Sequence, residues 1–133
     1  MKFKIFLVDD DPIYQEMLQE TLGWNPNYDV ISFDNGEDCL KNINDNPNVI
    51  VLDHHMDKGG LENRMNGDEV LKKIQETNPK TPVIMLTSQT IPGKTYDFIG
   101  EGACSYIQKG KGDITEIENS IKEIYENKKA PTS

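Results

Sequence analysis

The stretch Val49-Ile50-Val51-Leu52-Asp53 does most to determine the fold of this chain. Three of its four apolar residues are β-branched, and Pro47 precedes it, so it predicts a strand. Because the apolar run is uninterrupted, both faces of that strand should be buried, as in a parallel sheet covered by helices on each side. The run stops at the carboxylate of Asp53, which places a charged group where the strand leaves the core.

Working outward, four other short apolar segments predict strands, at residues 3–8, 30–33, 83–86 and 106–107. Each of these strands is followed by a segment that predicts a helix. The apolar residues of the first three helices are Ile13, Met17, Leu18 and Leu22; Cys39, Leu40 and Ile43; and Val70, Leu71 and Ile74. The fourth helix is expected over residues 91–99, and the fifth carries Ile114, Ile117, Ile121 and Ile124. The first helix should be capped by Asp11, begin at Pro12 and end at Gly23. This alternation predicts an α/β fold, a flavodoxin-like three-layer sandwich whose five parallel strands lie in the order 2-1-3-4-5.

The length of 133 residues fits one domain, expected over residues 1–127, with 128–133 as a tail or the start of a linker. The net charge of -9 argues against binding to nucleic acid or an anionic membrane. The apolar segment at the start is too short for a secretion signal and runs into three aspartates, so a cytoplasmic protein is expected. Cys39 and Cys104 have no metal-type spacing and are interpreted as reduced core thiols.

Polar side chains follow four of the predicted strands at the point where each strand ends. They are Asp9-Asp10-Asp11 after the first strand, Asp53 after the third, Thr87-Ser88 after the fourth and Lys109 after the fifth. In a parallel sheet these ends meet at one edge, where ligands bind. The sequence therefore predicts one site that holds several carboxylates, a hydroxyl and an ammonium.

Clustered carboxylates repel one another and need a counter-charge, which a hard cation such as Mg²⁺ supplies through oxygen ligands. A carboxylate can also attack phosphorus and form an acyl phosphate. Thr87 could then donate a hydrogen bond to one phosphoryl oxygen, and Lys109 could pair with another. Each residue alone has an ordinary explanation, and for Asp11 we favour the helix cap. The adjacent His54 and His55 are not interpreted as a transition-metal site, because neighbours in sequence usually point apart.

With these motifs the chain resembles the receiver domains of two-component response regulators. The resemblance spans residues 3 to about 125, and its motifs are Phe6-Leu7-Val8-Asp9-Asp10-Asp11-Pro12, Val49-Ile50-Val51-Leu52-Asp53, Val83-Ile84-Met85-Leu86-Thr87-Ser88 and Tyr106-Ile107-Gln108-Lys109. The resemblance implies Asp53 as phosphoacceptor, with Thr87 and Lys109 binding the phosphoryl group. It implies that Mg²⁺ or Mn²⁺ is held by Asp9, Asp10, Asp53 and the backbone carbonyl of His55. It also implies that Thr87 and Tyr106 form a conformational switch.

The same resemblance implies a signalling domain rather than an enzyme. A sensor histidine kinase or a histidine phosphotransfer protein would donate the phosphoryl group. The charge added at Asp53 would bias a surface formed by the fourth helix, fifth strand and fifth helix, and an output domain or protein would read that surface. Members of the family often pair through their last helices, which allows a homodimer.

Three features depart from the family pattern. Gly110 follows Lys109 where family members usually have a proline after a cis bond, so a trans bond is expected here. The loop after Asp53 carries an insertion over residues 57–66, interpreted as a tolerated surface loop or a lid. His55 and Gln89 fill positions that tune hydrolysis of the acyl phosphate in this family, and the sequence does not fix its lifetime.

Three alternatives stay open at this point. A haloacid-dehalogenase-like phosphatase would use Asp9 as nucleophile and Asp11 as acid/base, although Pro12 then stands where that family has Gly-Thr. A flavodoxin-like binding module would need a phosphate-binding loop in place of the three aspartates. A degenerate receiver would bind partners without phosphorylation.

Overall fold

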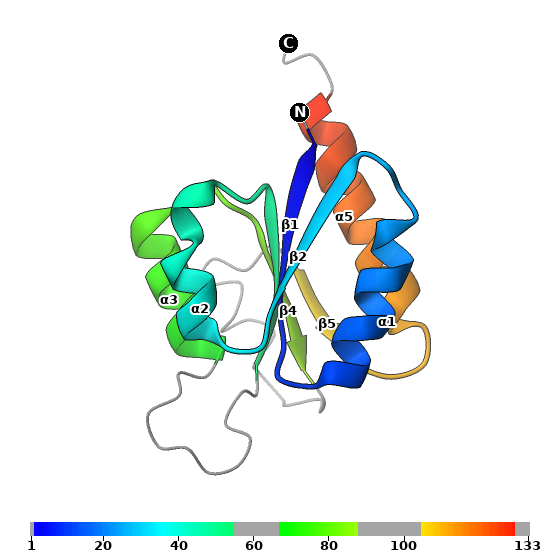
Figure 1. Cartoon of the computed structure of the whole chain (residues 1–133), viewed down its shortest axis with the longest axis horizontal. Coiled ribbons are helices and arrows are strands. Elements are labelled where there is room, and N and C mark those ends of the chain that lie inside the picture. The colour runs from blue at the N-terminus through cyan, green and yellow to red at the C-terminus, as the bar shows by residue number, and fades with distance from the viewer. Residues whose placement is uncertain (1, 55–66, 88–104, 130–133) are drawn as a thin grey trace.

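A computed structural model describes residues 2–54, 67–87 and 105–129 of the chain. Its five parallel strands are β1 (Phe3–Val8), β2 (Tyr28–Phe33), β3 (Val49–Asp53), β4 (Val83–Thr87) and β5 (Ser105–Gln108). They lie in the order β2-β1-β3-β4-β5, which confirms the predicted sheet (Figure 1). β3 lies at the centre and all five of its residues are buried, as its apolar sequence predicts.

Helices cover both faces of the sheet (Figure 1). On one side lie α1 (Pro12–Gly23) and α5 (Asp113–Lys129), and on the other lie α2 (Gly36–Lys41) and α3 (Gly67–Thr77). Because successive strand residues point to opposite faces, each strand contributes to two separate cores. The predicted helix over 91–99 and Cys104 lie outside the described residues. No helix in the described part of the chain combines the length and apolar character needed to span a bilayer.

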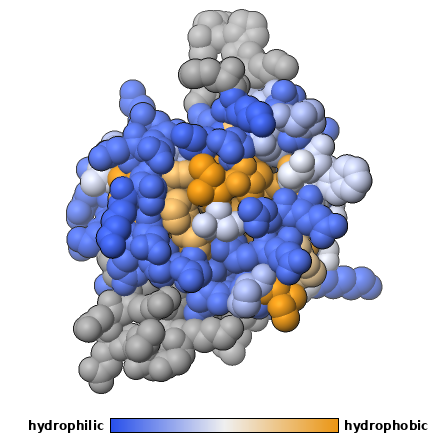
Figure 2. All heavy atoms as spheres, in the orientation of Figure 1, coloured by the Kyte–Doolittle hydropathy of each residue, from blue (hydrophilic) through white to orange (hydrophobic). Residues whose placement is uncertain are grey.

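The edge strand β2 contributes side chains to both cores, and all six of its residues are half-buried. Val30 packs against the core under α1 and α5, and Ile31 packs against the core under α2 and α3. Figure 2 shows apolar surface along this strand, flanked by the hydrophilic surfaces of the helical layers. Cys39 is fully buried in the α2 side, and burial raises the pKa of its thiol to about 12, so it is an unreactive, protonated thiol at neutral pH.

The first helix begins as predicted, because the side chain of Asp11 accepts hydrogen bonds from the backbone N–H groups of Ile13 and Tyr14. The predicted apolar face of this helix is partly wrong. Ile13 and Met17 are 71% and 46% exposed, whereas Leu18 and Leu22 are buried as expected.

The inward positions next to those leucines belong instead to Tyr14 and Gln15. Both side chains are buried because the fold supplies polar partners. The Gln15 amide lies 2.7 Å from the carbonyl of Phe33, and the Tyr14 hydroxyl bonds to a carboxylate on α5. Two polar side chains that each donate a hydrogen bond thus take the inward positions, and Ile13 and Met17 turn to solvent.

The prediction that Ile43 belongs to the second helix is also wrong. α2 ends at Lys41, and Ile43 begins a separate 3-10 turn, Ile43–Asp45. The side-chain amide of Asn42 donates to the Asp38 carbonyl, which is the acceptor that its own backbone N–H would use in an α-helix. The backbone N–H of Asn42 instead donates to the carbonyl of Cys39, three residues back rather than four, so the last turn tightens and the helix ends. Ile43 still reaches the core and is 6% exposed.

The junction between β3 and α3 is held by a close backbone contact at Gly67. Its N–H donates to the carbonyl of His54 at 2.9 Å. A Cβ atom at this position would lie 2.5 Å from the Asp53 carbonyl oxygen and 2.7 Å from the Cα of His54. Only glycine therefore lets α3 begin directly against the end of β3.

We predict that Gly67→Ala lowers the free energy of unfolding by about 1–3 kcal/mol, because the atoms met by the new methyl group are backbone atoms that cannot move aside. Gly23→Ala is the matched control. A Cβ at Gly23 meets nothing within 4 Å, so its stability should be unchanged or slightly higher. Urea unfolding of both variants measures the difference. Equal stabilities would contradict the tight junction.

Candidate functional site

Three carboxylates gather where β1 and β3 end. The parallel register pairs Val8 with Leu52, so Asp9 and Asp53 leave adjacent strands side by side. Carboxylate oxygens of Asp9, Asp10 and Asp53 all lie within 4.8 Å of one another, and this is the one such group found in the described ranges. Asp9 and Asp53 are only 2% and 4% exposed, while Asp10 is half-buried. Their arrangement fits a hard cation that prefers oxygen ligands.

Lys109 supplies a positive charge to this cluster from the end of β5. Its Nζ lies 2.7 Å from Oδ2 of Asp9 and 3.7 Å from Oδ1 of Asp53. Burial by itself lowers the pKa of the ammonium, but the hydrogen bond to Asp9 and the charges of Asp53 and Asp9 outweigh burial, and the pKa is raised. Lys109 is therefore charged at neutral pH. One ammonium beside three carboxylates leaves the cluster net negative.

The backbone around Lys109 is fixed on one side by β4. The N–H of Lys109 donates to the Thr87 carbonyl at 2.7 Å. The described ranges contain no cis peptide, so the bond between Lys109 and Gly110 is trans, as expected from the missing proline. Gly110 and Gly112 have positive φ values of 148° and 85°, a conformation that favours glycine, so the loop turns sharply after Lys109.

Two residues that the sequence analysis assigned no role complete the surroundings of Lys109. The ring of Tyr14 lies against the ammonium, with 4.3 Å between Nζ and the ring centroid. The Tyr14 hydroxyl donates to Oδ2 of Asp113 at 2.6 Å, and the same oxygen accepts the Gly110 N–H at 3.0 Å. Burial and then Asp113 raise the pKa of Tyr14, so it is a neutral donor. The sequence shows only that Tyr14 follows the predicted Asp11 cap by one helical turn, and this spacing does not indicate a bond to Asp113.

The other predicted site residues lie at the same edge, within β5 or outside the described part. Thr87 is fully buried at the end of β4, and its backbone holds Lys109. Tyr106 on β5 is half-buried and packs against the core beneath α2 and α3. His55, Gln89 and the insertion over 57–66 lie outside the described residues.

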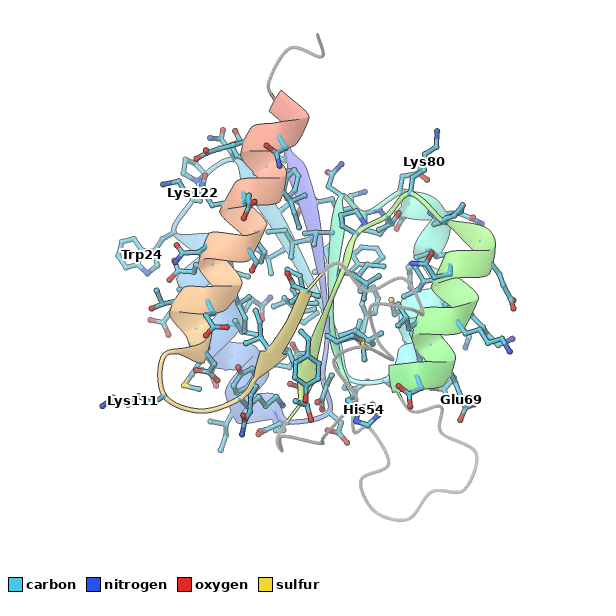
Figure 3. The ribbon with its side chains drawn as sticks, turned by 180° about the vertical axis from the view of Figure 1, so that it is seen from behind. Trp24, His54, Glu69, Lys80, Lys111 and Lys122 are labelled. Atoms are coloured by element: carbon cyan, nitrogen blue, oxygen red, sulfur yellow. The ribbon has the colours of Figure 1, made fainter. Side chains whose placement is uncertain are left out.

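His54 faces α3 rather than the acidic cluster. Its Nε2 lies 3.2 Å from Oδ2 of Asp68, and the ring is buried. Figure 3 shows His54 and Lys111 at the end of the molecule where the carboxyl ends of the strands meet. This contact ties the start of α3 to the residue after Asp53.

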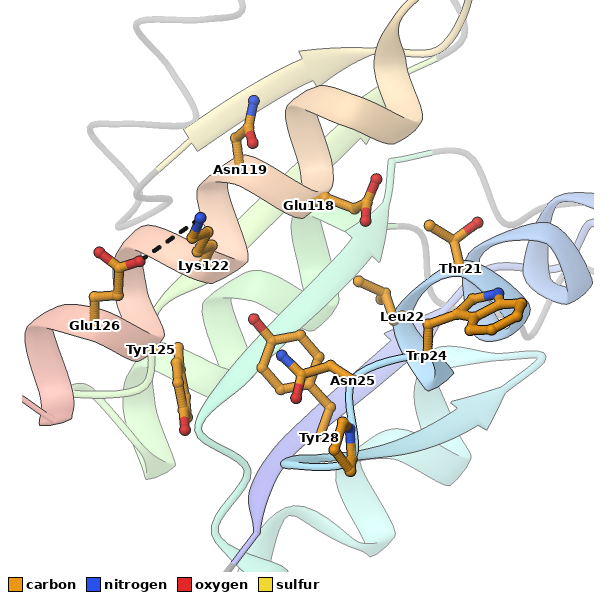
Figure 4. Close-up of a pocket in the computed structure, with 11 residues that line it drawn as sticks. Thr21, Leu22, Trp24, Asn25, Tyr28, Glu118, Asn119, Lys122, Tyr125 and Glu126 are labelled. Carbon is orange, nitrogen blue, oxygen red and sulfur yellow. Dashed lines mark ion pairs between the residues drawn. The ribbon is translucent and has the colours of Figure 1, made fainter.

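Two hollows differ in their relation to this site. One lies directly beside Asp9 and Asp10 and extends toward Gln15 and Asp38, so the cluster opens toward solvent on the side of the half-buried Asp10. The other lies at the opposite end of the sheet, between α1 and α5, and is lined by aromatic residues and the exposed pair Lys122 and Glu126 (Figure 4). The second hollow is remote from the carboxylates and takes no part in the chemistry that they support.

Asp113 should link the stability of this edge to pH. Burial alone raises the pKa of its carboxyl, but hydrogen bonds from Tyr14, Gly110 and Ile114 outweigh burial, and the pKa is lowered from 3.8. The charged carboxylate therefore stabilises the fold above that pH, and its contribution is lost as the pH falls through the lower folded-state pKa.

We predict that Asp113→Asn is less stable than the natural chain at neutral pH and that the difference shrinks below about pH 4. Urea unfolding from neutral pH to about pH 2 measures both curves. A stability difference that stays constant through the acid range would contradict the assigned hydrogen bonds.

Comparison with known proteins gives a consistent result. The profile described as the response regulator receiver domain matches residues 5–122. Protein-glutamate methylesterase/protein-glutamine glutaminase is 34% identical over 129 residues in Oceanobacillus iheyensis and 36% identical over 124 residues in Bacillus subtilis. Those matches cover 91% and 90% of this chain but only 35% and 33% of the relatives, so the chain spans about a third of their length. The receiver domain of Francisella response regulator 1452 superposes with a TM-score of 0.81 at 25% identity, covering 94% of this chain and 98% of that one.

Proposed function

Because the chain belongs to the response regulator receiver domain family, we propose that it accepts a phosphoryl group on Asp53 in a reaction that depends on Mg²⁺ or Mn²⁺. One observation carries the proposal: the Asp53 carboxylate lies among Asp9, Asp10 and the ammonium of Lys109 at the carboxyl edge of the sheet. A nucleophile, metal ligands and a countercharge for a phosphoryl group are thus in one place.

The donor set fits the proposed metal ion. Three carboxylates with one ammonium leave a net negative charge, and carboxylate oxygens are the ligands that Mg²⁺ takes in proteins. Asp10 and Asp53 would hold the ion directly, Asp9 would help, and the backbone carbonyl of His55 would complete the proposed set. When bound, the ion neutralises charge on the transferring phosphoryl group.

The chain's own residues perform the transfer. A carboxylate oxygen of Asp53 attacks phosphorus, and the phosphorus–nitrogen bond of a phosphohistidine donor breaks as the new phosphorus–oxygen bond forms. The leaving imidazole nitrogen keeps the electron pair and takes up a proton. Lys109, already charged and 3.7 Å from Asp53, pairs with a phosphoryl oxygen. The Thr87 hydroxyl binds another oxygen, and Tyr106 follows its movement.

The proposed partners follow from the same chemistry. A sensor histidine kinase or histidine phosphotransfer protein supplies the phosphoryl group, and an output domain or protein reads the changed surface. The longer relatives are named as methylesterases and glutaminases, and an output domain of that kind is one proposal for this chain. The domain itself would be a cytoplasmic signalling module rather than an enzyme, over residues 1–127, and a homodimer is compatible with it.

The phosphatase alternative gains no support. It needs Asp11 as acid/base beside Asp9, but the side chain of Asp11 caps α1 and bonds to the N–H groups of Ile13 and Tyr14. Asp11 is outside the carboxylate cluster, and Asp53 is inside it.

We predict that incubation with a small phosphodonor and Mg²⁺ adds the mass of one phosphoryl group, and that Asp53→Asn abolishes the gain because the nucleophile is lost. Intact-mass measurement with and without Mg²⁺ checks this. Asp11→Asn is the control, since asparagine also caps a helix and labelling should persist. Labelling of Asp53→Asn at the natural rate would contradict the proposal.

We predict that Asp10→Asn weakens Mg²⁺ binding by at least about tenfold, because it removes a charged oxygen ligand from a largely buried cluster. Asp11→Asn removes the same charge one residue along the chain and should leave the affinity nearly unchanged. Calorimetric titration of both variants with MgCl₂ measures the affinities. If the two substitutions weaken binding equally, the effect comes from the loss of one negative charge, and the assignment of Asp10 as a direct ligand is contradicted.

A further inference from the structure

The loop that carries Lys109 into the site needs an external support. It contains Gly110 and Gly112, both with positive φ, and glycine is the residue with the most backbone freedom to lose. On the strand side the loop is held by the bond from the Lys109 N–H to Thr87. On the helix side it is held by Asp113, whose carboxylate accepts the N–H groups of Gly110 and Ile114.

Tyr14 joins this loop to a different helix. Its hydroxyl donates to Asp113 across 99 residues of sequence, with 2.6 Å between the oxygens, and both side chains are buried, at 7% and 8% exposure. Hydrogen bonds to a charged acceptor are short and strong, more so away from water. The position of the loop after Lys109 is therefore tied to α1, the helix that begins directly after the acidic cluster.

The ring of the same tyrosine limits where the ammonium can go. Nζ of Lys109 lies 4.3 Å from the ring centroid, within the range of a cation–π contact, and the Asp9 and Asp53 carboxylates lie 2.7 and 3.7 Å away. The ammonium is thus bounded by an aromatic surface and two carboxylates. A long, flexible lysine side chain that would otherwise populate many rotamers is held toward Asp53.

We propose that Tyr14 is a positioning residue for phosphoryl transfer, which directs the Lys109 ammonium toward Asp53 through its ring and, through its hydroxyl, fixes the loop by way of Asp113. This inference rests on the proposed function. It explains how the chain aims Lys109 although a flexible glycine follows that lysine.

The test compares rates of phosphorylation of the full chain by acetyl phosphate with Mg²⁺, followed by intact mass. Tyr14→Phe keeps the ring and loses one buried hydrogen bond, and we expect a rate about three- to tenfold lower. Tyr14→Leu also loses the ring and should approach the rate of Lys109→Ala. Tyr28→Phe is the matched control, a half-buried tyrosine at the far end of the sheet, and its rate should match the natural chain.

A double-mutant cycle separates positioning from general loss of stability. In a Lys109→Ala background, Tyr14→Phe should cause no further loss of rate, because the group that it positions is gone. Asp113→Ala should slow the reaction as Tyr14→Phe does, and the two together should be no slower than either one. Thermal unfolding by circular dichroism establishes that each variant is folded.

The outcomes are distinguishable. A natural rate for folded Tyr14→Phe, or an equal slowing of the Lys109→Ala background, overturns the role of Tyr14 while Asp53 labelling and the Lys109→Ala defect leave the proposed function intact. Absence of labelling in the natural chain overturns the proposed function and this inference with it. A defect that disappears in the Lys109→Ala background supports the inference.

Discussion

The contact between the Lys109 ammonium and the buried carboxylates of Asp9 and Asp53 is the interaction on which this edge of the molecule depends. Two carboxylates that are almost fully buried on adjacent strands repel each other, and removing them from water is costly. A single ammonium offsets part of this cost and leaves the cluster negative. The same imbalance that strains the edge is what suits it to a divalent cation and a phosphoryl group.

The parallel sheet brings the repelling carboxylates together, and its packing also stabilises them in that position. Asp9 and Lys109 are 100 residues apart in the sequence and meet only because β1, β3, β4 and β5 all end at one edge. The two apolar cores on either side of the sheet provide the stabilisation that lets an electrostatically unfavourable site persist. Backbone contacts at Gly67 and at the Lys109 N–H then hold the ends of β3 and β5 in place. The result is a frame of packed strands and helices around a charged pocket.

Local sequence signals are sufficient to predict the strands of the sheet and the start of α1. The apolar segment ending at Asp53 and the cap at Asp11 have explanations within a few residues, and both predictions are confirmed. The side of α1 that faces inward was predicted only in part, because apolar periodicity favoured Ile13 while the fold offers a partner to Tyr14. Where a distant partner decides burial, the spacing of apolar residues is not enough.

The same limit applies to the site. Strand ends placed the carboxylates and Lys109 together, but nothing near Tyr14 in sequence indicates that Asp113 will receive its hydroxyl. The end of α2 was missed for a related reason, since the side chain of Asn42 takes a carbonyl that periodicity assigns to the backbone. Competition between side-chain and backbone hydrogen bonds has no signature in hydrophobic spacing. Both incorrect predictions involve polar side chains that form hydrogen bonds in the fold, those of Tyr14 and Asn42. At such positions the spacing of apolar residues does not determine the structure.

The central claim is that the carboxylates at this edge form one cation site facing Asp53. Anomalous diffraction from crystals grown with Mn²⁺ tests it most directly, because the ion marks its own position. We expect a single strong peak about 2.1 Å from carboxylate oxygens of Asp10 and Asp53. A peak elsewhere, or none in crystals where Asp9, Asp10 and Asp53 keep their mutual positions, would contradict it.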